Sequence, residues 1–390
     1  MSAIVYGDAR SGRSSAERLR EAGEEVVVVD RTLGNEDDLS LLDGARLLVK
    51  SPGVPGELPL VAAARERGIP VWSEVELGFT LLPGARFVGV TGTNGKTTTA
   101  ELLGEIFHAD GRDAAVAGNV GTPLTSVRAA DWVVCELSSF QLEDVHTFTC
   151  EVAVLLNLEP DHLDRHRTFE AYRDAKLRIF ERARAAVVPQ GFTLGNRYRP
   201  VTVATFTAGD ALPAEPRIRG PHNRENAAAA AAAARAAGIG EEAIAAGLRS
   251  FPGVPHRLEQ VGERDGVRYV NDSKATNVAA ARRGLAAYAD EPVHLILGGS
   301  LKGEDFAPLA AAVGPNVRSV HLIGEAARQL AEALTGREIF TDGDLEHAVA
   351  HAARLAEPGD VVLLSPACAS YDQFENYERR GDRFRELAQE

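Results

Sequence analysis

The chain has 390 residues, enough for roughly two or three domains, and its 45% hydrophobic and 25% charged content is that of an ordinary globular protein. Its formal net charge of −14 argues against a broad nucleic-acid-binding face, which needs a basic surface. We find no apolar run of membrane-spanning length, no signal-peptide pattern, and no CxxC spacing among the three cysteines. We therefore expect a cytoplasmic monomer with reduced thiols that neither binds nucleic acid nor inserts into a membrane.

Short β-rich runs alternate with helical patterns from end to end, which predicts an α/β protein built from parallel sheets wound with helices. At the N-terminus, strands are expected at 3–6 and 25–30, with a turn and a helix from about Ser14 between them. This arrangement is Rossmann-like, although the turn departs from GxGxxG. Further strands are expected at 46–49 and near 70–72, before a linker-like segment at 81–85.

A second sheet is predicted to end at a Pro/Gly cluster, 251–256, and a third unit then alternates strands with amphipathic helices to the C-terminus. The predicted domains are therefore 1–82, 83–253 and 254–390. The strands predicted in the second and third domains are 86–90, 131–137, 151–157, 268–270, 293–297, 319–323 and 360–364.

Lysine is rare in this chain, because five of its 42 basic residues are lysine and the rest are arginine. Compositional drift explains the scarcity but not the placement among glycine, acidic and hydroxyl residues. Lysine offers a compact ammonium group and an amine that can become nucleophilic, and arginine offers neither. Lys50 has no assigned role and is interpreted as surface charge. The lysines that are candidates for specific roles are Lys96, Lys176, Lys274 and Lys302.

The segment GTNGKTT at 92–98 follows a predicted strand and precedes a predicted helix, which is the setting of a phosphate-binding loop. Its glycines let backbone N–H groups turn toward phosphate oxygens, and the helix N-terminus adds positive partial charge. Lys96 would reach the phosphates, and the hydroxyl of Thr97 can bind Mg²⁺. Val90 stands where the general pattern has a small residue, so the loop is a variant. The alternative is a glycine-rich turn with a surface lysine.

Acidic residues that follow two predicted strands are candidate metal ligands. Glu136 ends an apolar strand, and ligands gather at the carboxyl edge of a parallel sheet; otherwise it is an ordinary solvated residue. The segment NLEPDHLDRH, 157–166, offers Asp161, His162 and Asp164 as ligands or bases, or is a charged loop without a role. Its spacing is not a zinc pattern.

The remaining lysines lie on a helix and in two loops. Lys176 is on an amphipathic helix, where the alternative is membership of a solvated face. NDSKATN places Lys274 and Thr276 after a strand, and GGSLKGEDF places Lys302 in a glycine-rich turn. Loops at the carboxyl ends of strands are where a substrate carboxylate or phosphate would be held.

Together these motifs resemble one family. GTNGKTT, ELSSFQLE, NLEPDHLDRH, AKLRIF, GPHNRENAAAA, GVPHRLE, NDSKATN and SPACASYDQFENYERRG occur in the order seen in Mur ligases. The resemblance spans about residues 1–385 and implies three α/β domains: N-terminal Rossmann-like, central P-loop ATPase-like and C-terminal Rossmann-like. It implies an ATP-dependent amide ligase of peptidoglycan precursor synthesis that works through an acyl phosphate. NDSKATN and SPACASYDQF favour the member that adds D-glutamate to UDP-N-acetylmuramoyl-L-alanine.

The resemblance also implies roles for individual residues. The expected ATP residues are Gly92, Thr93, Asn94, Gly95, Lys96, Thr97, Thr98, Asn223, Asn226, Arg257 and Asp272. Two Mg²⁺ sites are expected, one at Thr97 and Glu136 and one at His162 and Lys176, with the lysine carbamylated by CO₂, a conversion that arginine cannot undergo. The expected UDP-substrate residues are Ser11, Gly12, Asp30, Arg31, Gly53, Asn119 and His162. The expected D-glutamate residues are Lys274, Thr276, Lys302, Ser370 and Tyr377, and the expected catalytic residues are Lys96, Glu136, His162 and Lys176.

Two other functions are compatible with parts of this pattern. A related ligase with another substrate, such as folylpolyglutamate synthase, differs in lacking this N-terminal Rossmann-like domain. A nucleotide-binding regulatory protein that has lost catalysis would have no need of Lys176 and His162. The segment from about 188 to 219 is short for the Mur ligases, which predicts a trimmed peripheral hairpin.

Overall fold

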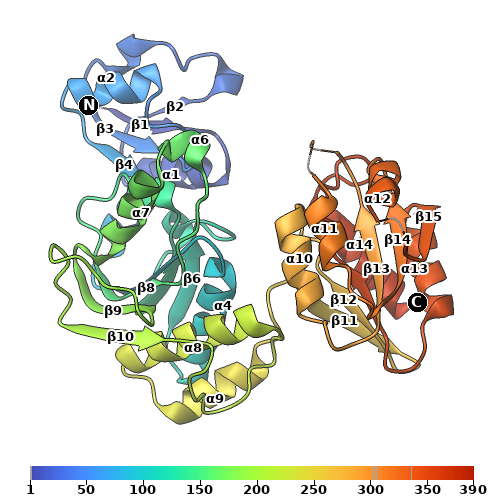
Figure 1. Ribbon diagram of the computed structural model, residues 1–390. Helices are drawn as coiled ribbons and strands as arrows, with labels where there is room; N and C mark the ends of the chain where they lie inside the picture. The colour runs from blue at the N-terminus through green and yellow to red at the C-terminus, as the bar shows by residue number, and fades with distance from the viewer. Residues whose placement is uncertain (1, 302, 304, 335) are drawn as a thin grey trace. The chain divides into compact units, whose positions relative to one another are not determined.

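The structure, a computed structural model, describes residues 2–301, 303, 305–334 and 336–390 (Figure 1). It divides into two compact units, one running from the N-terminus to Pro216 with His222–Phe251, the other comprising Arg217–Pro221 and Pro252–Glu390. Within the described residues, the first unit contains two sheets and the second contains one. The predicted α/β class with three sheet-containing domains is confirmed, and the exact domain limits stay a prediction. No helix in the described ranges is long and apolar enough to cross a bilayer.

The N-terminal sheet is four-stranded and parallel. In spatial order it consists of β2 (Val26–Val29), β1 (Ser2–Tyr6), β3 (Ala45–Lys50) and β4 (Val71–Ser73), and its helices are α1 (Arg10–Glu21), α2 (Pro59–Glu66) and α3 (Glu74–Thr80). Ala3 and Val5 pack with α1 and α3, whereas Ile4 and Tyr6 pack with α2 on the opposite face. Because both faces are covered, the strands are continuous apolar runs, which made them readable in the sequence.

The central sheet is six-stranded and parallel throughout. In spatial order it consists of β10 (Thr202–Phe206), β9 (Ala183–Pro189), β8 (Cys150–Leu155), β5 (Arg86–Thr91), β7 (Trp132–Glu136) and β6 (Ala114–Gly118). Its helices are α4 (Lys96–Ala109), α5 (Ser139–Leu142), α6 (Leu163–His166), α7 (Phe169–Leu177), α8 (Pro221–Ala236) and α9 (Glu241–Ser250). Strand β5 lies between β7 and β8, so the loops after these three strands meet at one edge.

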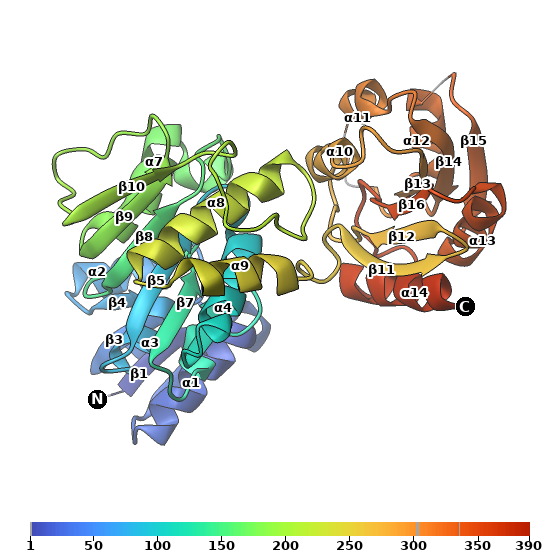
Figure 2. The same cartoon turned by 90° about the horizontal axis from the view of Figure 1, so that it is seen from below.

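Small residues let the helices of the central domain approach closely. The alanines 227–234 of α8 are all buried. Helices α4 and α9 pack against each other so tightly that a Cβ on Gly247 would lie 2.6 Å from Ile106 (Figure 2). The alanine run of α8 is therefore a packing surface.

The sheet of the second unit is also six-stranded, and its edge strand β11 runs antiparallel to β12. In spatial order it consists of β11 (Glu259–Arg264), β12 (Val267–Asn271), β16 (Val361–Leu364), β13 (Val293–Gly298), β14 (Val317–Ile323) and β15 (Ile339–Gly343). Its helices are α10 (Val278–Ala286), α11 (Ala307–Ala312), α12 (Ala327–Ala333), α13 (Leu345–Leu355) and α14 (Tyr377–Gln389). The core on one face includes residues of α10, α11 and α12, and the core on the other includes residues of α13 and α14.

Candidate active site

The glycine-rich loop between β5 and α4 has a tightly constrained backbone. Gly95 precedes the first residue of α4 in the left-handed conformation, with a φ of 84°. A Cβ at this position would lie 2.2 Å from Oδ1 of Asn226 on α8, so any other residue would strain the backbone and displace the Asn226 side chain. Asn226 in turn donates to Oδ1 of Asn223 at 3.3 Å. The loop therefore meets Asn226, which contacts Asn223, beside the N-terminus of α4, where helix N–H groups favour an anion.

The segment after β8 holds the glycine-rich loop in place. The backbone N–H of Asn94 donates to Oδ1 of Asn157 at 2.8 Å, and Nδ2 of Asn157 donates to the carbonyl of Asn94 at 3.2 Å. The hydroxyl of Thr93 lies 2.9 Å from that of Tyr172, and it accepts from the N–H of Glu159. These bonds fix the shape of the loop through side chains that are distant in the sequence.

Two predicted lysines meet at one carbonyl of this loop. Lys96 donates to the carbonyl of Gly92 at 2.9 Å and to that of Thr93 at 3.0 Å, and Lys176 donates to Gly92 at 2.8 Å. The side chain of Lys176 is buried, with its Nζ 4.7 Å from the ring centroid of Tyr172. Burial, assisted by the positive charge of Lys96, lowers the pKa of Lys176 to about 7. A substantial fraction of this amine is therefore neutral and nucleophilic near neutral pH.

Glu136 provides a buried carboxylate at the same sheet edge. It ends β7 in register with Val90 of β5, and only 3% of it is exposed. Nδ2 of Asn119 donates to Oε1 of Glu136 at 3.1 Å, so these two predicted residues are in contact. Thr97 is the second residue of α4, and the buried hydroxyl of Thr98 has no hydrogen-bond partner among the described residues. Buried oxygen ligands beside a phosphate-binding loop fit Mg²⁺, which takes hard oxygen donors.

His162 lies at the start of α6, in the left-handed conformation with a φ of 52°. Its ring centroid is 4.9 Å from that of Phe140, and its Nε2 is 3.5 Å from a carboxylate oxygen of Asp161. The ring of His166, a residue that was not among the predicted site residues, stacks on the ring of Phe140. Its Nε2 lies 2.9 Å from the hydroxyl of Ser139. Burial lowers the pKa of His166 to about 4, so it is a neutral packing residue.

The predicted UDP-substrate residues of the N-terminal domain follow the carboxyl ends of β1, β2 and β3. A Cβ on Gly12 would lie 1.6 Å from the carbonyl of Gly7, so α1 approaches the turn before it as closely as a glycine permits. The hydroxyl of Ser11 donates to that of Ser51, in the turn after β3, at 3.4 Å. The turns after β1 and β3 are therefore side by side, as ligand-binding loops of a Rossmann-like sheet are.

Asp30, after β2, holds its own loop together. It accepts from the N–H of Asp8 at 2.8 Å and from both the N–H and the hydroxyl of Thr32. The bond from the N–H of Asp8 is the largest of the influences that lower the pKa of Asp30. The side chain of Arg31 and the residue Gly53 are exposed.

The interpretation of Lys50 as surface charge is wrong. Only 1% of Lys50 is exposed, and its Nζ lies 3.1 Å from Oδ2 of Asp144 and donates to the carbonyl of Val54. Arg65 pairs with the other oxygen of Asp144 at 2.7 Å. Lys50 comes from the N-terminal sheet and Asp144 from the segment after α5, so the lysine stabilises the joint between two sheets, which a sequence cannot reveal.

In the second unit, Asp272 follows β12 and is buried. It accepts from the hydroxyl of Ser365 at 2.7 Å and from the N–H of Leu258 at 3.3 Å. Burial raises the pKa of Asp272 to about 7, against the opposing influence of Ser365 and of the positive charge of Arg257. The two predicted ATP residues of this unit are therefore neighbours, and their part in ATP binding stays a prediction.

The predicted D-glutamate residues of the same unit lie in separate loops. The Nζ of Lys274 is 5.6 Å from the ring centroid of Tyr377, the first residue of α14. Thr276, two residues after Lys274, is partly buried. The hydroxyl of Ser370 is buried and has no hydrogen-bond partner within the described residues. Lys302 lies outside the described residues.

Arg380 joins these loops, a role that no local sequence pattern indicates. Its buried guanidinium donates to the carbonyl and hydroxyl of Ser273, and to the carbonyls of Gly298, Cys368 and Ala369. Burial lowers its pKa to about 10. One side chain therefore sets the spacing of the loops that contain or adjoin Lys274, Ser370 and the GGS turn.

Comparisons with known proteins address the family directly. Residues 90–198 match the Mur ligase middle domain, and residues 256–368 match the Mur ligase glutamate ligase domain. The UDP-N-acetylmuramoylalanine–D-glutamate ligase of Myxococcus xanthus is 41% identical over 449 aligned positions, which cover 99% of this chain and 97% of that protein. The enzyme of the same name from Anaeromyxobacter dehalogenans is 42% identical, with the same coverage. The chain belongs to the Mur ligase family.

Solved structures of Mur ligases and their relatives share the fold. The UDP-N-acetylmuramate–alanine ligase of Thermotoga maritima covers 100% of this chain at a TM-score of 0.65 and 18% identity. A bifunctional folylpolyglutamate synthase/dihydrofolate synthase from Yersinia pestis covers 80% of this chain at a TM-score of 0.59 and 20% identity. The alignment of 449 positions is longer than the 390 residues here, so the Mur ligase from Myxococcus xanthus has segments that this chain lacks.

Proposed function

We propose that this Mur ligase joins D-glutamate to UDP-N-acetylmuramoyl-L-alanine at the expense of ATP, as a cytoplasmic monomer in peptidoglycan precursor synthesis. The observation that carries the proposal is the likeness, over 99% of the chain, to ligases named for this reaction. The geometry supports it, since the phosphate-binding loop, a buried carboxylate and a lysine of low pKa lie at one sheet edge.

The reaction needs an activated carboxylate. A carboxylate oxygen of the substrate attacks the γ-phosphorus of ATP, and the bond from that phosphorus to the oxygen bridging the β- and γ-phosphates breaks. ADP departs, and the substrate becomes an acyl phosphate. The amine nitrogen of D-glutamate then attacks the carbonyl carbon, inorganic phosphate leaves, and the amine releases its proton to solvent. The loop N–H groups and Lys96 would hold the phosphates in line for the first step. Bound Mg²⁺ neutralises phosphate charge.

Four residues would hold two Mg²⁺ ions. Thr97 and Glu136 supply neutral and anionic oxygen for the first, and His162 with a carbamate on Lys176 would serve the second. The neutral Nζ of Lys176 attacks the carbon of CO₂, forming an N–C bond, and one proton passes to solvent to leave a carbamate anion. The lowered pKa of Lys176 supports this step, because an ammonium ion has no lone pair with which to react.

The remaining predicted residues are assigned to the substrates. Asn223, Asn226, Arg257 and Asp272 are proposed to bind ATP outside the loop, and Ser11, Gly12, Asp30, Arg31, Gly53 and Asn119 to bind the UDP-substrate. Lys274, Thr276, Lys302, Ser370 and Tyr377 are proposed to bind D-glutamate, where the lysines offer positive charge to carboxylates.

The test is an acceptor panel. The protein is mixed with ATP, Mg²⁺ and UDP-N-acetylmuramoyl-L-alanine, and each of a set of amino acids is added in turn while phosphate and product are measured. Release of phosphate with D-glutamate alone is expected, and Lys96→Ala should abolish it. Release only with another amino acid would reassign the substrate, and no release with any acceptor would overturn the ligase function.

A further inference from the structure

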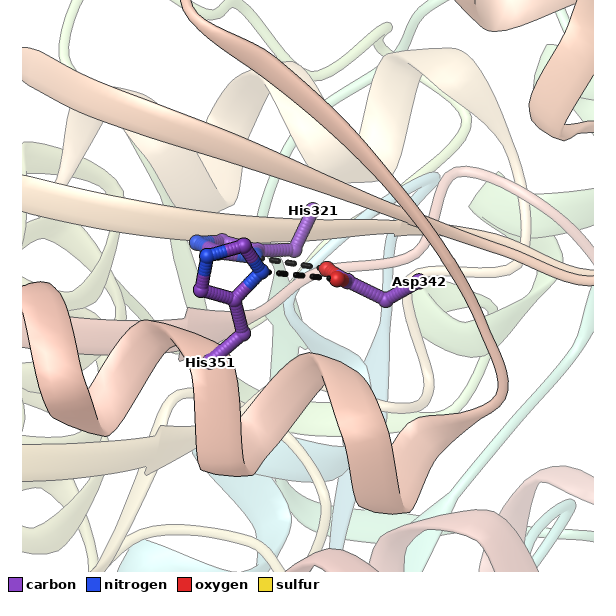
Figure 3. A group of neighbouring side chains, drawn as sticks. All are labelled: His321, Asp342 and His351. Atoms are coloured by element: carbon purple, nitrogen blue, oxygen red, sulfur yellow. Dashed lines mark hydrogen bonds and ion pairs between the residues drawn. The ribbon is translucent and has the colours of Figure 1, made fainter.

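Three side chains of the second unit form a cluster that the ligase chemistry does not use. His321 of β14, Asp342 of β15 and His351 of α13 point toward one another (Figure 3). Nδ1 of His321 lies 2.7 Å from Oδ2 of Asp342, and Nδ1 of His351 lies 2.8 Å from Oδ1. One ligand atom from each residue lies within 4.8 Å of the other two. His321 is fully buried, whereas Asp342 and His351 are partly exposed.

A chain of hydrogen bonds continues inward from His321. Its Nε2 lies 2.9 Å from the hydroxyl of Ser319, which lies 2.7 Å from Nδ1 of His294. Nε2 of His294 lies 3.0 Å from Oδ2 of Asp360. That carboxylate also accepts from Arg318 at 3.1 Å, so it is the acceptor at the end of the chain.

With both imidazoles neutral, this chain is one hydrogen short. Asp342, His321, Ser319, His294 and Asp360 are joined by four contacts, whereas two neutral imidazoles and one hydroxyl supply three hydrogens. If His294 donates to Asp360, Ser319 must donate to His294 and His321 must donate to Ser319. The Nδ1 lone pair of His321 then faces a carboxylate oxygen at 2.7 Å. Reversing the bonds moves the shortage to another link without removing it.

A cation placed among these three side chains removes the shortage. We propose that His321, Asp342 and His351 bind a divalent transition-metal ion of the Zn²⁺ class. Two imidazole nitrogens and one carboxylate suit Zn²⁺ and its neighbours, whereas Mg²⁺ prefers oxygen ligands. The bond from Nε2 of His321 to Ser319 is the outer contact that orients a ligating histidine.

The fit requires a modest rearrangement of the cluster. Bonds of about 2.0–2.1 Å to a tetrahedral ion place ligand atoms about 3.3 Å apart. At present the two histidines lie 2.7 and 2.8 Å from different oxygens of Asp342, and the three ligand atoms lie within 4.8 Å of one another. Asp342 lies in the edge strand β15 and is able to move, and the partial exposure of His351 leaves a route for the ion and a position for water. The ion would fasten β15 and α13 to the buried strand β14, independently of the ligase reaction.

The test uses the full-length protein, freed of metal with a chelator and then titrated with Co²⁺ and Zn²⁺ in a large excess of Mg²⁺. We expect a single Co²⁺ ion per chain with the intense visible absorption of a four-coordinate site, which Zn²⁺ displaces. His351→Ala should weaken binding by at least about 100-fold. His347→Ala is the matched control, since His347 lies one turn earlier on α13, exposed and paired with Asp344, and it should bind as the wild type does.

Asp342→Asn separates a metal ion from an extra proton. The amide of the variant supplies the missing hydrogen to Nδ1 of His321 and still accepts from His351, so the metal-free variant should unfold at or above the temperature of the metal-free wild type. Zn²⁺ should raise the unfolding temperature of the wild type and leave that of Asp342→Asn unchanged. The proposal is overturned if the wild type retains no ion in excess Mg²⁺, if Asp342→Asn binds equally well, or if His347→Ala loses as much affinity as His351→Ala.

Discussion

At the level of single residues, Lys176 derives its chemistry from its surroundings. Its amine is buried, shares the carbonyl of Gly92 with Lys96, and has a pKa of about 7. If it functions as a carbamate, Lys176→Ala should lower kcat by at least about 100-fold, and acetate or another short carboxylate should restore part of the rate. Lys176→Arg keeps the charge, fills the space and should not respond to acetate. Wild-type turnover by the unrescued alanine variant would discard the carbamate.

The sequence was enough to find the site residues that can be recognised from their neighbours in the chain or from the composition. Lys96 lies in a motif, and Lys176 drew attention because lysine is rare in the chain. The roles of Lys50 and Arg380 depend on partners far away in the sequence, Asp144 for the first and the carbonyls of three loops for the second. Burial and pairing of this kind are set by the tertiary fold, so no local pattern announces them.

At the level of elements, the close contact between Gly95 and α8 predicts that adding one methyl group, in Gly95→Ala, lowers both stability and nucleotide affinity. Gly95→Ala should lower the free energy of unfolding by about 1–2 kcal/mol through left-handed strain. It should also weaken binding of an ATP analogue by about 10-fold or more, equivalent to about 1.4 kcal/mol, because the new Cβ would lie 2.2 Å from Asn226. Fluorescence titration with the analogue and urea unfolding measure the two effects.

Gly111→Ala is the control for this experiment. Gly111 follows α4 with a φ of 75°, and a Cβ there meets no atom within 4 Å. It should show the same backbone strain with unchanged nucleotide affinity. Equal affinities for the Gly95 and Gly111 variants would mean that close packing of α8 on the loop does not shape the nucleotide site.

The contacts of Arg380 with several loops lead to a second prediction at the level of elements, which concerns stability and the KM for D-glutamate. Lysine at this position cannot reach all the oxygens that the guanidinium binds, so Arg380→Lys should destabilise the protein by roughly 3 kcal/mol. If the arginine spaces the loops for D-glutamate, the KM for D-glutamate should rise more than the KM for ATP. Arg379→Lys, at an exposed neighbouring position, should change neither. Equal rises in both KM values for Arg380→Lys would indicate a purely structural role.

The strands themselves were predictable to different extents. Buried central strands such as β5, β7 and β13 are apolar runs, and the sequence located them. The edge strands β6, β10, β11 and β15 were not predicted, because AAVAG, TVATF, EQVGER and IFTDG are short or partly exposed and lack the continuous apolar run of a strand covered on both faces. The inner strand β9 was also not predicted, although most of it is buried.

At the level of the whole molecule, buried carboxylates join the N-terminal sheet to the central domain within the first unit. Glu76 of α3 accepts from the N–H groups of His146, Thr147 and Phe148 at 2.9, 2.6 and 3.1 Å, so both of its oxygens face donors. Glu76→Gln would turn an amide toward those donors and should cost about 2 kcal/mol of unfolding free energy at neutral pH. Urea unfolding of the variant and the wild type measures this, and equal stabilities would contradict it.

Glu74, two residues earlier, should make the stability of the protein depend on pH. Its Oε1 accepts from the N–H and hydroxyl of Thr125, but its buried Oε2 has no hydrogen-bond partner among the described residues, and burial raises its pKa from 4.5 to about 7. Between these two values the folded protein keeps a proton that the unfolded chain has lost, so wild-type stability falls as pH rises, by about 1.4 kcal/mol per pH unit. Below the lower value and above the upper one this contribution is constant.

Glu74→Gln removes the titrating group while keeping the acceptor for Thr125. The variant should therefore gain stability relative to the wild type as pH rises from 4.5 to about 7, and the gain should level off above that range. Thermal or urea unfolding of both proteins across this range gives the difference. A difference that is independent of pH would show that the carboxyl is already ionised in the folded state, with a donor supplied to Oε2 by solvent at the joint between the two sheets.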